Sequence, residues 1–328
     1  MNYSVPIGII IPAYNAEKTI KNCIESILNQ THTKWIAYVI DDGSTDSTPS
    51  ILETFANNDE RIHVYRQKNG GVSEARNTGL TLAKTPYIMM VDSDDSLPEH
   101  AIEYMLKAAK LHNDCDFVIS SFTRTNPNGK KTTHNIGIED GLNNLISQHI
   151  TKIPGAPWAK LYKKSIIDAT QLRFVKDLKV SEDNLFVKCY LSQVKKITVV
   201  NSSLYNYEFS PSSVIHRFET GAAPFDVYAD VLSVPLRISE WLKLHPATNA
   251  PECDWNSILL ADILNNILWL EWSLPSNRRK WKRHLRLQGI KYAAQLAKEM
   301  NIIRALPTIC KYLTYYLKGR MKRLIHRQ

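Results

Sequence analysis

The chain has 328 residues, 44% of them hydrophobic, and a formal net charge of +9. This length and composition exclude a disordered or repetitive chain and allow one large domain or two of ordinary size. Its 5 cysteines are scattered without a CxxC pair, which excludes a zinc framework and suits a reducing cytoplasm. The N-terminal stretch lacks a signal-peptide pattern, and no apolar run approaches the ~18 residues of a membrane span.

Short apolar runs alternate with amphipathic stretches along the first 125 residues. They predict strands at 5–11, 35–40, 62–65, 87–91 and 116–122 and helices at 20–28, 47–56, 73–83 and 98–112, with Asn15 capping the first helix. The alternation favours an α/β fold, a mainly parallel, Rossmann-like sheet with helices on both faces. From about residue 222 onward the pattern is helical.

Three polar loops follow strands of this predicted sheet, at 12–15, 41–46 and 92–99. In parallel sheets the ligand crevice lies beyond the carboxyl ends of the strands. Since each loop leaves such an end, we expect the three loops to converge on one site.

Asp92 and Asp94 stand two residues apart directly after the 87–91 strand. Two carboxylates at this spacing can bind one hard cation, and Mg²⁺ or Mn²⁺ takes one or two carboxylates together with phosphate oxygens and water. An acidic turn ahead of the next helix is the alternative interpretation. A calcium-binding EF-hand is excluded, because Leu97 stands where that loop requires glycine.

The DDGSTD stretch at 41–46 also has two interpretations. Asp-Gly followed by Ser and Thr is typical of a turn that caps a helix. A carboxylate at this position can instead accept hydrogen bonds from a base or from ribose hydroxyls. The expected closeness of this loop to Tyr14 and Asp92 favours the second interpretation.

Five ordered blocks resemble the inverting glycosyltransferases of family 2, which have the GT-A fold. The blocks are IIIPAYN (9–15), DDGSTD (41–46), GVSEARNTG (71–79), DSDD (92–95) and ED (182–183). They lie within about residues 5–210, and five blocks in order are more specific than any one of them. We therefore expect a GT-A nucleotide-sugar-binding and catalytic domain at 1–215, followed by a helical, basic region at 216–328.

The resemblance implies a nucleotide-sugar donor, commonly a UDP-sugar, and a divalent cation, Mn²⁺ or Mg²⁺. It implies that Asp92 and Asp94 bind the metal, with Asp94 as the more direct ligand. Arg76 is expected near the donor pocket, with a structural ion pair as the alternative. The donor-binding residues expected from the resemblance are Pro12, Ala13, Tyr14, Asn15, Asp42, Arg76, Asp92, Ser93 and Asp94.

The resemblance also implies that Asp183 is the catalytic base. Displacement with inversion needs one base for the acceptor hydroxyl, whereas a retaining scheme needs a nucleophile and an acid across the bond. The acids at 182–183 can equally complement the dipole of the following helix. Trp158 and Lys160 lie in a WAKLY stretch that implies an acceptor-side wall, with a core tryptophan and its lysine as the alternative.

The positive charge is concentrated at the end of the chain, where residues 278–328 contain 15 Lys/Arg and one acidic residue. Tyrosines and leucines among these residues favour association with an anionic membrane surface. A helix docked by its apolar stripe is one alternative, and nucleic-acid binding is another, although no such module is recognisable. We therefore expect a cytoplasmic protein, peripheral at the inner face of the membrane.

The sequence thus predicts a metal-dependent inverting glycosyltransferase that acts on a glycan or lipid-linked glycan in bacterial surface polysaccharide or lipopolysaccharide synthesis. One alternative is a sugar nucleotidyltransferase, which would need a glycine-rich basic loop after the first strand. The other is a non-catalytic sugar- or nucleic-acid-binding module.

Overall fold

The structure is a computed structural model that describes residues 5–111, 115–136, 141–143, 153–209, 225–249, 254–273 and 279–299. The chain divides into two compact units, Met1–Asp177 with Glu182–Pro211, and Leu178–Ser181 with Ser212–Gln328. The domain boundary predicted near residue 215 and the basic stretch 302–328 lie outside the described residues.

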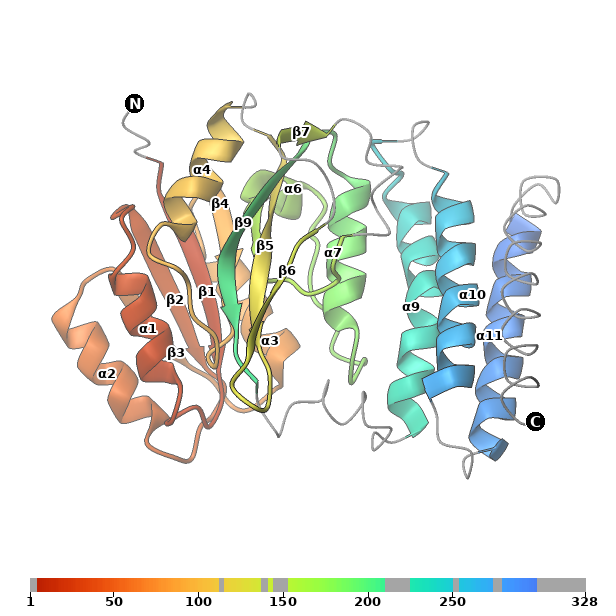
Figure 1. The fold of residues 1–328 in the computed structure, drawn as a ribbon, viewed down its shortest axis with the longest axis horizontal. Helices are drawn as coiled ribbons and strands as arrows, with labels where there is room; N and C mark the ends of the chain where they lie inside the picture. The colour runs from red at the N-terminus through yellow and green to blue at the C-terminus, as the bar shows by residue number, and fades with distance from the viewer. Residues whose placement is uncertain are drawn as a thin grey trace. The chain divides into compact units, whose positions relative to one another are not determined.

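Within the described residues of the first unit, nine strands form one sheet in the order β3-β2-β1-β4-β8-β5-β9-β7, with β6 paired to β5 (Figure 1). The strands β1 to β4 pair in parallel, and β8 runs antiparallel to both β4 and β5. After two reversals β5 again runs in the direction of β4, and β9 is parallel to β5. The carboxyl ends of β1, β2, β4, β5 and β9 therefore lie at one edge of the sheet. The strands are β1 (Ile7–Ala13), β2 (Trp35–Asp41), β3 (Ile62–Arg66), β4 (Tyr87–Met90), β5 (Phe117–Thr125), β6 (Lys131–His134), β7 (Gly141–Asn143), β8 (Lys160–Lys163) and β9 (Ile197–Tyr207).

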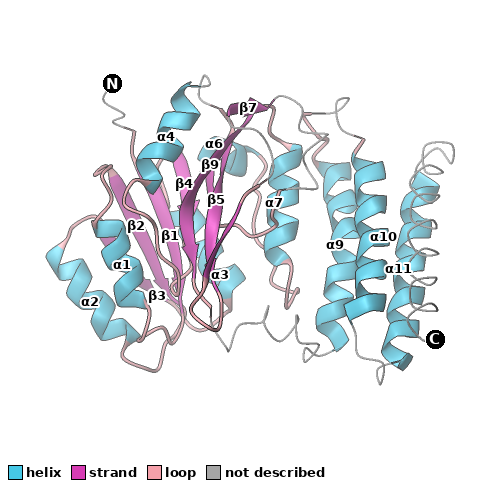
Figure 2. Ribbon diagram, in the orientation of Figure 1, coloured by secondary structure: helices cyan, strands magenta, loops and turns pink. Residues whose placement is uncertain are grey.

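Helices cover both faces of this sheet (Figure 2). Ile9 and Ile11 of β1 share one hydrophobic core with buried side chains of α1, α2 and α4. Ile10 points to the other face, where a Cβ on Gly79 of α3 would lie 2.4 Å from its Cγ2. Burial on both faces explains why β1 is apolar at almost every position. The helices are α1 (Ile20–Leu28), α2 (Thr48–Asn58), α3 (Val72–Leu82), α4 (Ala101–Leu111), α6 (Lys164–Ala169) and α7 (Glu182–Ser192).

The predicted α/β fold is confirmed, and the strands and helices expected in the first 125 residues are present with ends shifted by a few residues. The capping role predicted for Asn15 is wrong, because α1 begins at Ile20, after Thr19, and Asn15 has a φ of 47°. The sequence did not predict β8 or β9. Since β8 is only four residues long and β9 changes from apolar to polar residues, neither has the pattern of a buried strand.

The second unit contains the described helices α9 (Phe225–Leu244), α10 (Trp255–Ser273) and α11 (Arg279–Glu299), which lie side by side in Figure 1. They approach closely at Gly289 of α11, where a Cβ would lie 2.5 Å from Ile267 Cγ1 of α10 and 3.3 Å from Leu232 Cδ2 of α9. The predicted helical C-terminal region is thereby confirmed. Over the described part of the chain, no helix has the length and apolar character needed to cross a membrane.

Candidate active site

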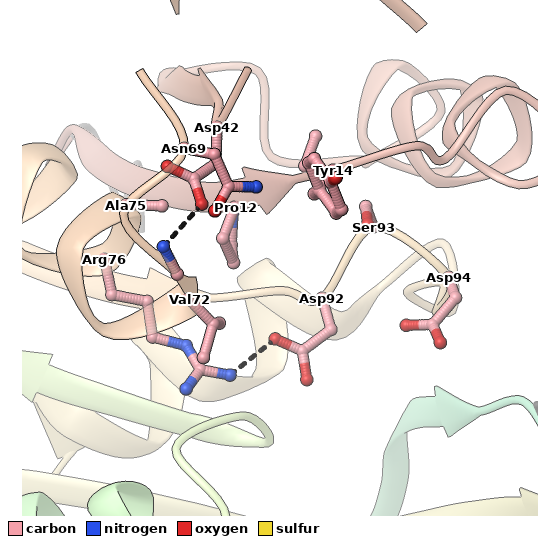
Figure 3. Close-up of a pocket in the computed structure, with 12 residues that line it drawn as sticks. Pro12, Tyr14, Asp42, Asn69, Val72, Ala75, Arg76, Asp92, Ser93 and Asp94 are labelled. Atoms are coloured by element: carbon pink, nitrogen blue, oxygen red, sulfur yellow. Dashed lines mark hydrogen bonds and ion pairs between the residues drawn. The ribbon is translucent and has the colours of Figure 1, made fainter. Parts of the chain in front are cut away.

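A pocket of about 390 Å³ opens beyond the carboxyl ends of β1, β2 and β4. The three loops that the sequence predicted to converge all contribute to its walls, as does the segment that leads into α3 (Figure 3). Every residue expected to bind the donor lines this pocket except Asn15. The lining residues are Pro12, Ala13, Tyr14, Asp42, Asn69, Gly71, Val72, Ala75, Arg76, Asp92, Ser93 and Asp94.

Tyr14 and Asn15 have different surroundings although they are adjacent in sequence. Tyr14 exposes 52% of its surface at the pocket, so a planar ligand can pack against its ring. Asn15 instead holds the 41–46 loop. Its backbone N–H donates to Ser44 Oγ at 3.0 Å, and its side-chain Oδ1 accepts from the Thr45 N–H at 2.9 Å. Asn15 thus positions the loop that contains Asp42.

Asp42 joins the end of β2 to the glycine turn before α3. Its Oδ1 accepts hydrogen bonds from Gln67 Nε2 at 2.8 Å and from the Gly70 N–H at 2.9 Å, and its Oδ2 accepts from the Gly71 N–H at 2.7 Å. Gly71 has a φ of 87°, which favours glycine, and it precedes the first residue of α3. Asp42 therefore shapes the wall of the pocket opposite Asp92.

Arg76 links two acidic segments that are far apart in the sequence. Its Nη2 lies 2.9 Å from Asp92 Oδ1, and its Nη1 lies 3.2 Å from Glu182 Oε1 (Figure 3 shows the first pair). The Arg76 side chain is only 6% exposed. Burial by itself lowers its pKa, but the charges of Asp92 and Glu182 outweigh that effect and raise the pKa above its ordinary value. Arg76 therefore lines the pocket and forms a buried ion pair, and its place beside a bound donor stays a prediction.

The acidic loop, defined here as residues 92–95, has two different kinds of carboxylate. Asp94 faces the pocket, and burial followed by the charge of Asp92 raises its pKa to about 6. Asp95 is 2% exposed, and its carboxylate accepts from the Tyr205 hydroxyl at 2.5 Å and from the Glu208 N–H at 2.8 Å. Tyr205 also accepts from the Asp92 N–H at 3.2 Å. Asp95 is therefore a structural acid that fixes the loop.

The donor atoms of Asp92 and Asp94 fit a magnesium or manganese ion. Both side chains present carboxylate oxygens to the same pocket, and hard cations of this kind bind one or two carboxylates. The described residues contain no group of three or more His, Cys, Asp or Glu side chains arranged to hold a metal. Phosphate oxygens of a ligand and water would have to complete the coordination shell.

Asp183 lies at the amino end of α7, where its Oδ1 accepts from the Asn184 N–H at 2.6 Å. Burial raises its pKa, while the charges of Arg76 and Lys160 act in the opposite direction. Burial, and to a smaller extent the negative charge of Asp183, raises the pKa of the neighbouring Glu182 to about 7. A carboxylate whose pKa is raised above its ordinary value binds a proton more tightly, which suits general base catalysis.

Lys160 is buried with its ammonium group inside the protein. It is 1% exposed and its Nζ donates to Ala156 O at 2.6 Å and to Trp158 O at 3.3 Å. Burial lowers the pKa of Lys160 to about 7, and the charge of Asp183 acts in the opposite direction. Trp158 is 7% exposed and stacks on Tyr205 with the ring centroids 4.7 Å apart. Both residues of the predicted acceptor wall are thus interior side chains.

Sequence reasoning missed Asn69, Gly71, Val72 and Ala75 as pocket residues. The Gly-Gly turn before the predicted 73–83 helix was the available signal, because a helix that begins at the carboxyl edge of a sheet points its first turn at the ligand. Tyr205 had no such signal, since it lies in the strand that the sequence did not predict.

Comparison with known proteins identifies the class of this site. The sequence profile described as "Glycosyl transferase family 2" matches residues 8–170. The protein named "Putative glycosyltransferase EpsH" of Bacillus subtilis (strain 168) is 29% identical over 297 residues, or 87% of this chain and 82% of EpsH. The chain belongs to glycosyl transferase family 2. As a member of this family it is a glycosyltransferase.

Other relatives of this family 2 glycosyltransferase match over different lengths. The poly(ribitol-phosphate) beta-glucosyltransferase of Bacillus spizizenii is 30% identical over 213 residues, which are 62% of this chain and 32% of that protein. The crystal structure of S. aureus TarS 1-349 in complex with UDP-GlcNAc has a TM-score of 0.72 at 20% identity, over 95% of this chain and 92% of that one. This structural similarity confirms the predicted GT-A fold.

Proposed function

We propose that this family 2 glycosyltransferase moves a sugar, with inversion, from a UDP-sugar to a hydroxyl of a glycan or lipid-linked glycan in bacterial surface polysaccharide synthesis. The observation that supports it best is that Arg76 forms ion pairs with both Asp92 and Glu182, because these pairs hold the acidic loop next to Glu182 and Asp183. Asp183, the proposed base, follows Glu182 at the start of α7 and is not among the lining residues, so the proposal places it on the acceptor side of the donor. The nucleotide sugar in the TarS complex supports the donor class.

The reaction is one displacement at C1 of the sugar. Asp183 takes the proton of the acceptor hydroxyl as the oxygen forms its bond to C1. The bond between C1 and the diphosphate oxygen breaks on the opposite face, and its electron pair leaves with the UDP. The buried setting that raises the pKa of Asp183 also strengthens its affinity for that proton.

Other residues of the pocket bind and orient the donor. Tyr14 would pack against the base, and Asp42 would keep the glycine turn in position beside the ribose. Asp92 and Asp94 would hold a divalent cation, which supplies positive charge to the departing diphosphate when bound. Arg76 would hold the Asp92 carboxylate in place through its ion pair.

The test is UDP release from UDP-sugars in the presence of Mn²⁺ or Mg²⁺ and candidate acceptors. Asp183→Asn keeps the side-chain shape but removes the base, so we expect a loss of transfer by about 10²- to 10⁴-fold with UDP binding retained. Asp168→Asn is the matched control, since Asp168 is 52% exposed in a pair with Lys164. Full transfer by Asp183→Asn would refute the assignment of the base. Formation of UTP and a sugar 1-phosphate from the UDP-sugar after addition of pyrophosphate would indicate a nucleotidyltransferase.

Association with an anionic membrane is part of this proposal. In α11, Leu287 and Ile290 are 51% and 48% exposed, and the exposed Arg283 and Lys291 lie at helical spacing from them. Exposed apolar side chains between basic ones suit a lipid interface. In liposome flotation with the full chain, we expect recovery on anionic but not on neutral vesicles, and a reduced recovery for Leu287→Asp. Equal recovery on both vesicle types would contradict the membrane association.

A further inference from the structure

A short segment directly ahead of the proposed base belongs to the second unit rather than to the first. We call residues 174–182 the strap, and they lead into α7, which begins at Glu182. Within the strap, Leu178–Ser181 is grouped with the C-terminal helices, whereas the residues on either side of it are grouped with the sheet. The chain therefore passes from the first unit into the second and returns to the first just before Asp183.

The two ends of the strap are fixed to α3. The Phe174 N–H donates to Asn77 Oδ1 at 2.8 Å, and Asn77 Nδ2 donates to Phe174 O at 2.8 Å. At the other end, Arg76 Nη1 lies 3.2 Å from Glu182 Oε1. These contacts fix where the strap leaves and rejoins the first unit, but they do not include residues 178–181.

Two carboxylates of α9 hold the middle of the strap. Asp230 Oδ2 accepts from the Lys179 backbone N–H at 2.8 Å. Burial raises the pKa of Asp230, and hydrogen bonds from the backbone N–H groups of Lys179 and Val180 act in the opposite direction. Asp226 pairs with the Lys179 ammonium group, but these two side chains are 48% and 66% exposed. Since an exposed pair of this kind contributes little, Asp230 is the stronger anchor.

Ser181 has a backbone conformation that its own side chain disfavours. Its φ is 65°, in the left-handed region that a residue with a Cβ rarely occupies. Such a conformation persists where the surrounding structure fixes the chain on both sides of it. Here Asp230 fixes the backbone two residues before Ser181, and Arg76 fixes Glu182 directly after it. Without Asp230 the φ of Ser181 would relax to a negative value, which would redirect the chain that enters α7.

We propose that Asp230 of α9 is a positioning residue for the catalytic base, and that it fixes Asp183 by anchoring the strap. This inference rests on the proposed role of Asp183 as the base. A base acts only within hydrogen-bond reach of the acceptor hydroxyl, so a small displacement of Asp183 lowers the rate of transfer. The competing explanation is that Asp230 only stabilises the helical unit, which would not affect Asp183 in particular.

The kinetic test compares Asp230→Ala with Asp230→Asn and with Asp226→Ala. We expect Asp230→Ala to lower kcat by roughly 10- to 100-fold, because a misplacement of about 1 Å has an effect of this size. UDP affinity and the KM for the donor should keep their wild-type values, since Asp230 does not line the pocket. Asp230→Asn keeps an oxygen acceptor for the backbone N–H groups and should restore kcat to within about 3-fold. Asp226→Ala removes the exposed pair with Lys179 and should match the wild type.

A double-variant cycle separates positioning from stability alone. Once Asp183→Asn has removed the base, Asp230 has no base to position. We therefore expect Asp183→Asn/Asp230→Ala to transfer no more slowly than Asp183→Asn, whereas two independent losses would multiply. Multiplied losses would overturn the proposal, as would a wild-type kcat in Asp230→Ala or an equal loss in Asp230→Asn.

Hydrogen exchange tests the anchor without any turnover. In Asp230→Ala we expect faster exchange in peptides that cover residues 178–190, which include the first turns of α7, and unchanged exchange in α3. If the wild type transfers no sugar, the proposed function fails, and this measurement still decides the link between Asp230 and α7. Exchange that is faster only at residues 178–181, or unchanged throughout, would overturn the link. Full transfer by Asp183→Asn would instead overturn the proposal through the base itself, whatever the exchange shows.

Discussion

Replacing the buried Arg76 with methionine tests the electrostatic account of the site. Methionine keeps most of the aliphatic stem and removes the charge that lies between Asp92 and Glu182. Glu182 is only 12% exposed and Asp92 is 26% exposed, so both would lose a partner in a poorly hydrated environment. Breaking a buried pair costs about 3–5 kcal/mol, and the partial exposure of Asp92 favours the lower end, about 3 kcal/mol.

The loss of stability should depend on pH in a defined direction. Burial and Asp183 raise the pKa of Glu182 from 4.5 to about 7. A carboxyl group with a raised pKa in the folded protein retains a proton that the unfolded chain has released, so stability falls as pH rises through this window. Without Arg76 the pKa of Glu182 rises further, and the window extends above 7. The free-energy difference between wild type and Arg76→Met should therefore be smallest near pH 5 and largest above pH 7.

Urea unfolding of both proteins at pH 5, 7 and 8.5 measures this difference. Lys176→Met is the matched control, because Lys176 pairs with Glu74 at 2.8 Å while the two side chains are 58% and 40% exposed. That exposed pair should contribute less than about 1 kcal/mol, with little change over this range of pH. A destabilisation of Arg76→Met that stays constant from pH 5 to pH 8.5, or that equals the loss in Lys176→Met, would refute the reasoning.

Two further predictions concern residues that position the catalytic groups. Lys160→Met removes a positive charge that lowers the pKa of Asp183, so the acidic limb of the pH profile of kcat should move to higher pH. Well above pH 7 the substitution should have little effect, because burial lowers the pKa of Lys160 to about 7 and its charge is then absent in the wild type as well. An unchanged acidic limb would contradict this. Tyr205→Phe removes the hydroxyl between the Asp92 N–H and Asp95, which should cost about 1–3 kcal/mol in urea unfolding and weaken UDP binding. Wild-type values in both assays would show that the acidic loop needs no such support.

The sequence by itself determined the class of fold and the place of the site. Alternation of apolar runs with helical spacing specified strands and helices up to about residue 125, because each pattern depends only on neighbours in the chain. Polar loops at the carboxyl ends of parallel strands then had to meet at one edge, and Tyr14, Asp42, Asp92 and Asp94 do line one pocket there. Five short blocks in order were enough for the family.

Only the tertiary structure decided the roles of the remaining residues. Arg76 bonds to residues 16 and 106 positions away, and Tyr205 bonds to Asp95 from 110 positions away. The Tyr205 pair depends on where β9 enters the sheet, and the mixed sequence of this strand does not encode that position locally. The Glu182 pair depends on where α7 packs, which is also set by the tertiary structure. Lys160 illustrates the physical reason. A lysine usually lies at the protein surface, but here the backbone carbonyls of Ala156 and Trp158 provide acceptors that allow the ammonium group to be buried.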